Sequence, residues 1–476
     1  MQDILYDYEV NSTTWVYLSS LIIIAVYFKF RRFWSVRNLD LIGLILFAPG
    51  LLLVLHGWKV KDQTASPLNA TKTPALESGQ DRERVDLSEK SPPPMSDTAH
   101  KVDEGKEKPD SNALLRRQFE QRGYLWLFVV GVFFLLRMLI DSAMVRRPLL
   151  EPNLSASGLT FTCAAMLVFL MSNVIAPPRT NASSQAGAHP GAVAPVKAGH
   201  AEAEEAPQQQ GPGYPLFRLF ASESDNPVKQ ATAIIAHLAI VLGMVLIGYR
   251  HFDNTHTGIA AATLYLLLPY TANFTPRIDH VVPAALLVWA IQSYRRPVLA
   301  GIFVGLAAGL IWYPLFLLPL WCSFYWRRGL LRFSLAVLIV LAIMAVSLLL
   351  SPYSLGSYTL GSYSNQFCHT FGIMYTPAAD IRGFWEDSLA PFRWPVMAAF
   401  IAMCGSMALW PPQKNLGSLL ACSAAIMLGT QFWKAYEGGT FMAWYLPLLI
   451  LAIFRPNLED RVALSAISEG WRKWRK

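Results

Sequence analysis

The residues that could do chemistry in this chain gather first in a short polar turn between two apolar runs. Residues 273–280 read Asn-Phe-Thr-Pro-Arg-Ile-Asp-His. Asp279 can act as a general base there, because the neighbouring Arg277 and His280 orient it and adjust its proton affinity. The alternative is an interfacial turn whose charged side chains only face water. The chemistry that this turn suggests is proton abstraction by a carboxylate.

A second polar segment follows a later apolar run. Residues 434–439 read Lys-Ala-Tyr-Glu-Gly-Gly. We expect this segment to face the same side of a membrane as Asp279, where a lysine can hold a lipid-linked phosphate as a point charge. The alternative is that the Lys434 ammonium only reaches the lipid headgroups. Lys434 and Glu437 are therefore candidate substrate-binding residues.

A longer polar stretch, residues 351–394, mixes aromatic side chains with charged ones, among them His369, Asp380 and Arg382. Sugar-binding surfaces combine such groups, because aromatic rings stack on the apolar faces of a sugar and charged groups pair with its hydroxyls. An amphipathic segment lying in the membrane interface has a similar composition. We count His369, Asp380 and Arg382 as candidate substrate contacts.

One ion pair is predicted inside an apolar run. Arg137 and Asp141 are four residues apart, so they share a helix face and can pair, which makes their burial tolerable. We interpret this pair as structural and expect it at the cytoplasmic end of its helix. If that end lies with the other polar groups instead, Asp141 becomes the alternative catalytic carboxylate.

The composition indicates which elements must position these residues. The chain has 476 residues, of which 53% are hydrophobic and 15% charged, whereas soluble proteins carry about 25% charged residues. That much apolar surface excludes a water-soluble enzyme and indicates a multi-span membrane protein. The net charge of +8 lies largely beside apolar runs, so it indicates membrane topology and no nucleic-acid partner.

The apolar runs predict an all-α integral membrane protein with about 11–13 transmembrane helices, because a bilayer core of about 30 Å needs roughly 20 apolar residues per helix. The run 298–326 is long for one crossing and contains Pro314, which predicts a kink or two half-helices. The charge pattern favours a hairpin that begins and ends on one side, and one tilted crossing is the alternative. The candidate spans are 13–28, 39–58, 123–141, 157–176, 230–249, 257–274, 281–294, 298–326, 330–350, 395–410, 416–433 and 440–454.

The spans divide the chain into six parts. Residues 59–122 and 177–228 are predicted to be disordered linkers, because they hold too few large apolar side chains to offset the entropy of ordering. The other parts are an N-terminal hairpin, a helix pair, a main domain that carries the 351–394 loop, and a basic cytoplasmic tail, at residues 1–58, 123–176, 229–456 and 457–476.

Lysines and arginines orient the predicted helices. Placing them in the cytoplasm gives an extracytoplasmic N-terminus, a cytoplasmic C-terminus, and extracytoplasmic segments at 273–280, 351–394 and 434–439. We expect a multi-pass protein of the plasma (inner) membrane without a cleavable signal peptide. The orienting residues are Lys29, Arg31, Arg32, Arg146, Arg147, Arg295, Arg296, Arg327, Arg328, Arg332, Lys414, Arg472, Lys473, Arg475 and Lys476.

Signatures of other classes are missing from the sequence. It contains no G-x-G-x-x-G, G-x-x-x-x-G-K-[ST], H-E-x-x-H or G-x-S-x-G motif. The five cysteines lack zinc-site spacing, so we expect no cofactor and leave only a divalent cation open. The alternatives to an enzyme are a secondary transporter or flippase for a lipid-linked or anionic solute, and a non-catalytic membrane scaffold. A transporter is disfavoured because the two halves of the chain differ and the charges cluster at span ends.

Residues 295–329 carry a family resemblance. Arg-Arg-Pro is followed by VLAGIFVGLAAGLIWYPLFLLPLWCSFYWRRG, which is a small-residue helix, an aromatic-proline break, a Leu/Pro-rich helix and a basic turn. The pattern resembles the integral-membrane glycosyltransferases of the C superfamily (GT-C), in particular the polyprenol-phosphate-sugar-dependent mannosyl- and arabinofuranosyltransferases. The likeness covers residues 260–330 well and 230–455 loosely. The matching residues are Ala300, Gly301, Gly305, Ala307, Tyr313, Pro314 and Pro319.

The resemblance implies a glycosyltransferase that moves a sugar from a polyprenyl-phosphate donor to an extracytoplasmic acceptor, with membrane lipids as its surroundings. It implies a carboxylate that activates the acceptor hydroxyl and places Tyr313 among the substrate contacts. The family carries an acidic residue in its first extracytoplasmic loop, and no acidic loop here matches it. Asp279 is the nearest substitute by position and Asp141 by order along the chain. We expect Asp279 to be the base, Lys434 to lie near the donor phosphate, and the 351–394 loop to cover the acceptor.

Overall fold

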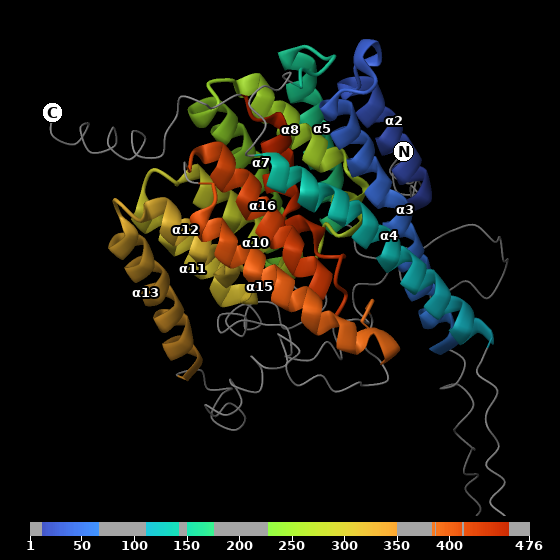
Figure 1. The fold of residues 1–476 in the computed structure, drawn as a ribbon. Helices are drawn as coiled ribbons and strands as arrows, with labels where there is room; N and C mark the ends of the chain where they lie inside the picture. Colours follow the sequence, from blue (N-terminus) through green and yellow to red (C-terminus); the bar gives the residue numbers. More distant parts are fainter. Residues whose placement is uncertain are drawn as a thin grey trace, which may run out of the picture.

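The computed structural model describes residues 12–65, 111–141, 150–175, 227–349, 383–385, 387–411 and 414–456. All regular elements within these ranges are helices, which pack into one bundle (Figure 1). Six of them are long and apolar enough to cross a membrane, and five shorter apolar helices accompany them. The prediction of an all-α, multi-pass membrane protein is confirmed for the described part of the chain.

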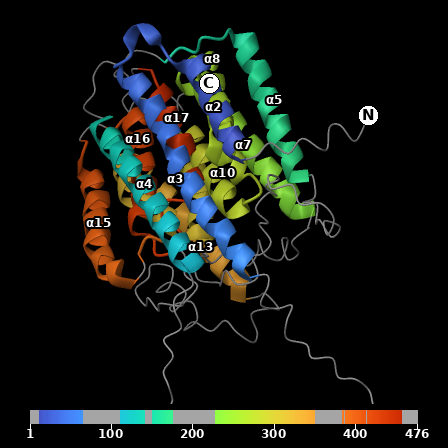
Figure 2. The ribbon, with the colours of Figure 1, turned by 90° about the vertical axis from the view of Figure 1, so that its right-hand side faces the viewer.

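Two helices of the N-terminal part, α3 and α4, lie side by side and run antiparallel (Figures 1 and 2). One face of α3 carries Gly43, Gly50 and Gly57 at seven-residue spacing, which brings the two backbones close. A Cβ added to Gly43 would lie 2.9 Å from Phe134, and one added to Gly57 would lie 2.5 Å from Glu120. The helices of this part are α2 (Ser12–Tyr27), α3 (Val36–Ala65), α4 (Ser111–Asp141) and α5 (Ala156–Ile175).

The predicted linker 59–122 is helical at both of its ends, contrary to expectation. Helix α3 continues to Ala65, and α4 begins at Ser111. The two helices pack on one another past the apolar run, with the rings of His56 and Phe119 5.1 Å apart, so each helix stabilises the extension of the other. The rest of both predicted linkers, residues 66–110 and 176–226, lies outside the described ranges.

The expected span 257–274 is two helices instead of one. Pro269 lacks the backbone N–H that would continue a helix, and Leu268 before it takes an extended conformation. The break brings Tyr270 and Phe274 against the start of the next helix. The helices of this part are α7 (Pro227–His251), α8 (Thr255–Leu267), α9 (Pro269–Asn273) and α10 (Ile278–Gln292).

The long run 298–326 forms a hairpin. Trp312 interrupts it with a φ of 58°, and the chain then returns to the end from which it came. A Cβ added to Gly329, which follows the hairpin, would lie 3.0 Å from Pro297, which begins it. The predicted hairpin is therefore observed, and the single tilted crossing is not. The elements here are α11 (Pro297–Ile311), the 3₁₀ turn η3 (Tyr313–Leu317), α12 (Leu318–Tyr325) and α13 (Leu330–Leu349).

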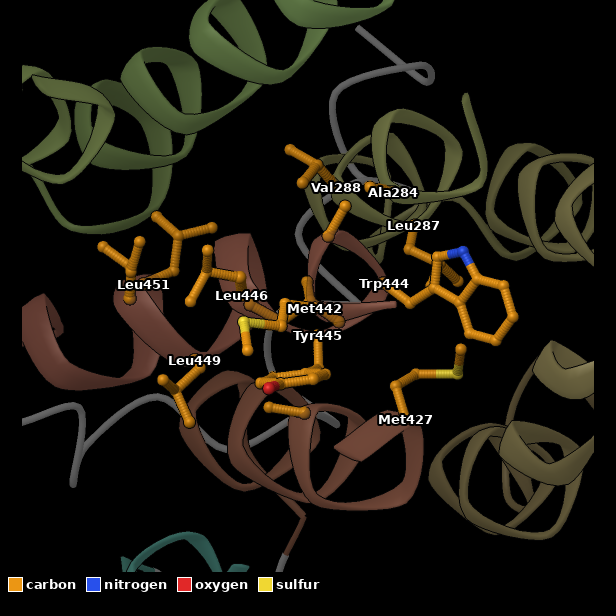
Figure 3. Close-up of a cluster of buried hydrophobic side chains, with 14 of the residues drawn as sticks. Ala284, Leu287, Val288, Met427, Met442, Trp444, Tyr445, Leu446, Leu449 and Leu451 are labelled. Atoms are coloured by element: carbon orange, nitrogen blue, oxygen red, sulfur yellow. The ribbon is translucent and has the colours of Figure 1, made fainter. Parts of the chain in front are cut away.

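The last two helices occupy the centre of the bundle. Nearly every residue of α16 and every residue of α17 is buried. Figure 3 shows their core, in which Met427, Tyr445 and Leu446 lie near Leu287 and Val288 of α10. Helix α17 has nine residues and is about 14 Å long, so the predicted full span 440–454 is wrong. This part contains η4 (Asp387–Phe392), α15 (Arg393–Leu409), α16 (Leu416–Trp433), η5 (Met442–Trp444) and α17 (Leu446–Phe454).

The two ends of the bundle differ in charge. One end, here called the basic end, carries the connections α2–α3, α10–α11, α12–α13 and α15–α16. Tyr325 donates to the Tyr294 carbonyl there over 2.6 Å, and Ser323 donates to the Ala408 carbonyl. The opposite end, the site end, carries residues 274–278 and 434–445. The predicted grouping of basic residues is thus observed at the basic end for Lys29, Arg31, Arg295, Arg296, Arg327, Arg328, Arg332 and Lys414.

Candidate functional site

Arg277, Asp279 and His280 stand together at the beginning of α10, as the sequence predicts. Arg277 immediately precedes the helix, and Asp279 lies in its first turn, where a carboxylate faces the positive end of the helix dipole. Arg277 Nη2 lies 3.3 Å from Asp279 Oδ2, and His280 Nε2 lies 3.5 Å from the same oxygen. The carboxylate is therefore held between a guanidinium and an imidazole.

The 434–439 turn closes on this group from the end of α16. Glu437 and Gly439 have φ values of 49° and 98°, and glycine adopts this left-handed conformation without strain. The Gly439 N–H donates to the Gln431 side chain over 3.2 Å, which folds the turn back onto α16. Glu437 consequently lies 3.8 Å from Arg277, so the guanidinium bridges two carboxylates.

Lys434 lies close to the cluster, as expected, but its ammonium is inside the protein. The side chain has no exposed surface. Its Nζ donates to the Tyr436 carbonyl over 2.7 Å and lies 3.7 Å from the centre of the Phe441 ring. The neighbouring Trp444 donates from Nε1 to the Asp279 carbonyl over 3.1 Å. Lys434 thus fixes the shape of the turn that carries Glu437.

Asp279 and Arg277 are the members of the cluster that reach the surface most. The exposed fraction of the side chain is 26% for Asp279 and 18% for Arg277, against 9% for Glu437 and none for His280. Lys229, in the first turn of α7, is half-buried and interacts electrostatically with both Asp279 and Arg277. A reachable carboxylate can accept a proton, and the two cations beside it can bind an anionic group.

The described end of the 351–394 segment packs against the same turn. A Cβ added to Gly383 would lie 3.1 Å from the Ala435 carbonyl oxygen, and Trp385 donates to the Phe432 carbonyl over 2.9 Å. This end of the loop therefore contacts the segment that carries Glu437, and a loop that covers the acceptor stays a prediction. The three candidate contacts of the loop lie outside the described residues: His369, Asp380 and Arg382.

A surface cavity of about 290 Å³ opens beside this loop. Its lining is mostly apolar, and the Arg393 guanidinium in it donates to the Trp433 carbonyl over 2.6 Å. In the nearby turn, burial raises the pKa of Tyr436 and outweighs the opposite effect of Arg393, so the phenol stays protonated. The lining residues are Trp385, Ala390, Pro391, Arg393 and Trp394.

Tyr313 lies beneath the cluster. It is 1% exposed, and its ring centre is 5.6 Å from that of Trp433 and 5.3 Å from that of Trp444. It therefore supports the tryptophan that holds Asp279, and a substrate contact by Tyr313 stays a prediction.

Asp141 belongs to a different cluster, at the basic end. Arg137 binds Asp141 at 2.8 Å, as predicted, and also Asp40 at 3.0 Å. Arg455, which follows α17, binds Asp141 at 2.7 Å. All four side chains are buried, so the network ties α3 and α4 to the C-terminal end of α17. The structure does not bring Asp141 to the Asp279 cluster, which favours the structural interpretation of the pair.

Within the described residues, no group of three or more His, Cys, Asp and Glu side chains could hold a metal ion. Comparison of the chain with protein-family models, curated proteins and solved structures gives no match.

Three polar residues at the site end were not identified from the sequence. Lys229 follows a predicted linker, so its position opposite Asp279 depends on how α7 packs. Tyr270 lies in an apolar run, where only the helix break at the preceding Pro269 points to it, yet its hydroxyl contacts His280. Glu120 falls in the predicted linker but is buried in α4. The signal that could have found Glu120 is the apolar spacing of Leu115 and Phe119 upstream of the α4 run.

Proposed function

We propose that this protein is a membrane glycosyltransferase of the GT-C kind, which moves a sugar from a polyprenyl-phosphate donor to an acceptor outside the cytoplasm. The observation that carries the proposal is the cluster of Arg277, Asp279 and Glu437 at the end of the bundle opposite the basic end. Its accessible carboxylate and cations suit the two requirements of such a transfer, proton removal and phosphate binding.

In the proposed reaction, the acceptor hydroxyl oxygen attacks the anomeric carbon of the donor sugar while the bond from that carbon to the phosphate oxygen breaks. Asp279 takes the hydroxyl proton, and polyprenyl phosphate leaves with the bonding electrons. Arg277 and Lys229 are the reachable cations for the phosphate charge. Lys434 acts indirectly, through the turn, because Tyr436 and the Phe441 ring enclose its ammonium.

The acceptor side of the proposal rests on the cavity beside the 351–394 loop. Trp385 and Trp394 line it together with Arg393, and indole rings stack well on the apolar faces of sugars. A cavity of about 290 Å³ has room for a sugar ring. We infer that the acceptor saccharide binds here.

The orientation in the membrane is part of the proposal. Because basic loops stay in the cytoplasm, the grouping of Arg295, Arg296, Arg327 and Arg328 at one end supports a cytoplasmic basic end. The site end then faces outward from the plasma membrane, with α2 beginning outside and α17 ending inside.

Transport is the rival function, and the interior of the bundle disfavours it. The ionic clusters lie at the two ends, around Asp279 and around Asp141. A single apolar cluster of buried side chains extends between them among the described residues, whereas secondary transporters place their binding sites near the middle of the membrane. A non-catalytic scaffold does not need partly buried carboxylates at the site end, so these carboxylates also disfavour the scaffold function.

The proposal is tested by Asp279→Asn in purified protein in lipid vesicles with labelled polyprenyl-phosphate hexoses and pentoses. We expect loss of sugar transfer by at least about 100-fold, because general-base catalysis contributes roughly that much, with donor binding retained.

The matched control is Asp253→Asn. Asp253 is exposed at the basic end with a φ of 53°, a conformation that asparagine adopts readily, and this variant should transfer sugar like the wild type. Full activity of Asp279→Asn would contradict the proposed base.

A further inference from the structure

Tyr270 and His280 form a buried hydrogen-bonded pair directly behind the candidate base. The Tyr270 hydroxyl oxygen lies 2.5 Å from His280 Nδ1. The rings of Phe274 and Phe441 stack on the imidazole, with centres 5.2 and 4.3 Å away, so the orientation of the imidazole is fixed. Its second nitrogen, Nε2, faces Asp279 Oδ2 at 3.5 Å.

The surroundings of Tyr270 determine which atom of the pair carries the proton. The Tyr270 phenol is buried, and burial disfavours its ionised form, so it keeps the proton that its O–H donates to Nδ1. Burial of the imidazole disfavours a second proton on the ring, and the positive charges of Arg277 and Lys434 act in the same direction, against the opposite effect of Asp279. A neutral imidazole that accepts at Nδ1 carries its proton on Nε2.

We propose that Tyr270 is a positioning residue, which fixes the tautomer of His280 so that the Nε2–H faces the Asp279 carboxylate. The inference rests on the proposed function only where it makes Asp279 the base, because the tautomer is a property of the resting protein. The N–H stabilises the ionised carboxylate, the form that can take a proton from an acceptor.

The distance of 3.5 Å between Nε2 and Asp279 exceeds that of an ordinary hydrogen bond. Contacts between catalytic groups are often long without substrate and shorten when it binds. Nε2 is buried and has no hydrogen-bond partner, so a small approach of the carboxylate would satisfy both groups. Without the Tyr270 hydroxyl, the ring can instead present the lone pair of Nε2, which repels the carboxylate.

Tyr270→Phe alters none of the other charged groups that face Asp279. Arg277 lies on the same segment, Glu437 on the 434–439 turn and Lys229 on α7. The effect of Tyr270→Phe therefore reports the hydroxyl alone.

A second tyrosine–histidine pair supplies the control. The Tyr265 hydroxyl lies 3.1 Å from His237 Nδ1, and His237 Nε2 lies 3.1 Å from the Thr275 carbonyl oxygen. This pair is also buried, but its imidazole faces a neutral carbonyl. Tyr265→Phe thus removes the same group from the same kind of pair without touching the carboxylate.

The test is nitrogen NMR of the full-length protein labelled with ¹⁵N-histidine in lipid bilayers. The signals of His280 are those missing from His280→Gln. We expect a non-protonated Nδ1 and a protonated Nε2 in the wild type, a changed His280 tautomer in Tyr270→Phe, and unchanged His280 signals in Tyr265→Phe. A wild-type spectrum with a protonated Nδ1 would overturn the inference, and so would unchanged His280 signals in Tyr270→Phe. The wild-type spectrum decides even if a variant fails to fold.

Kinetics separates this inference from the proposed function. Tyr270→Phe should lower kcat for sugar transfer roughly tenfold, as the loss of one hydrogen bond in a charged network implies, and leave KM for the donor unchanged. A rise in KM alone would contradict a role through Asp279. If the wild-type protein transfers no sugar at all, the proposed function fails, and the spectra still decide the tautomer.

Discussion

Lys434 shows how a single residue can be found by sequence and still be assigned the wrong contact. A lysine after an apolar run is predicted to reach a phosphate, but the Lys434 ammonium is enclosed by the Tyr436 carbonyl and the Phe441 ring. The sequence could not reveal this, because the enclosure depends on the left-handed backbone at Glu437 and Gly439. At the residue scale, therefore, charged residues can be found from the sequence, but their exposure cannot.

Lys434→Met should destabilise the protein without weakening its binding of the lipid donor. The Tyr436 carbonyl would lose its donor inside the protein, which costs about 1–3 kcal/mol. Thermal unfolding in lipid nanodiscs measures the first effect, and equilibrium binding of labelled polyprenyl phosphate measures the second.

Lys414→Met is the control, because Lys414 also donates to backbone carbonyls, those of Ala408 and Pro411, but is half-exposed at the basic end. Its loss of stability should be smaller. A strong loss of donor binding in Lys434→Met, with stability unchanged, would restore Lys434 as a direct phosphate ligand.

The pairing of α11 with α13 shows what the sequence predicts about elements. The break of the 298–326 run could be predicted because the aromatic-Pro sequence stops a helix, and the basic residues on both sides indicated a return. The parallel packing could not be predicted. Gly301 lies against Phe333 and Gly305 against Val337. Helix α11 therefore packs in parallel with α13, which also begins at the basic end.

Gly301→Ala should destabilise the bundle by about 1–3 kcal/mol, because overpacking at a fixed backbone forces the helices apart. The added Cβ would lie 2.6 Å from the Phe333 carbonyl oxygen. Gly405→Ala in α15 is the control, since a Cβ there meets nothing within 4 Å. It should leave the midpoint of thermal unfolding unchanged or raise it, as alanine favours a helix by up to about 1 kcal/mol. Equal midpoints for both variants would contradict this packing.

The lengths of the central helices could not be predicted correctly from the sequence. Hydropathy alone does not distinguish α8 with α9, or α17, from a helix that spans a bilayer. Both are enclosed by neighbouring helices, so they need no match to the thickness of a bilayer, and their lengths are set by proline breaks and by packing in the core.

At the scale of the whole molecule, charge is separated between two ends. The distribution of Arg295, Arg296 and the other basic residues could be predicted from the chain because loops between helices alternate in side. Arg277 contacts Glu437, 160 positions later, because α10 packs beside η5. No local sequence pattern predicts this contact. The ion network around Asp141 likewise depends on Arg455, which no local spacing connects to it.

The central claim is that the cluster around Asp279, and not the basic end, holds the phosphate of a lipid carrier. Equilibrium binding of labelled polyprenyl phosphate to purified protein in nanodiscs tests it, with Arg277→Gln compared against Arg296→Gln, an exposed arginine of the basic end. We predict that Arg277→Gln raises Kd roughly tenfold to a hundredfold, the loss of a charge-assisted hydrogen bond, while Arg296→Gln binds like the wild type. Unchanged binding by Arg277→Gln, or a wild-type protein that does not bind the carrier, would contradict the account.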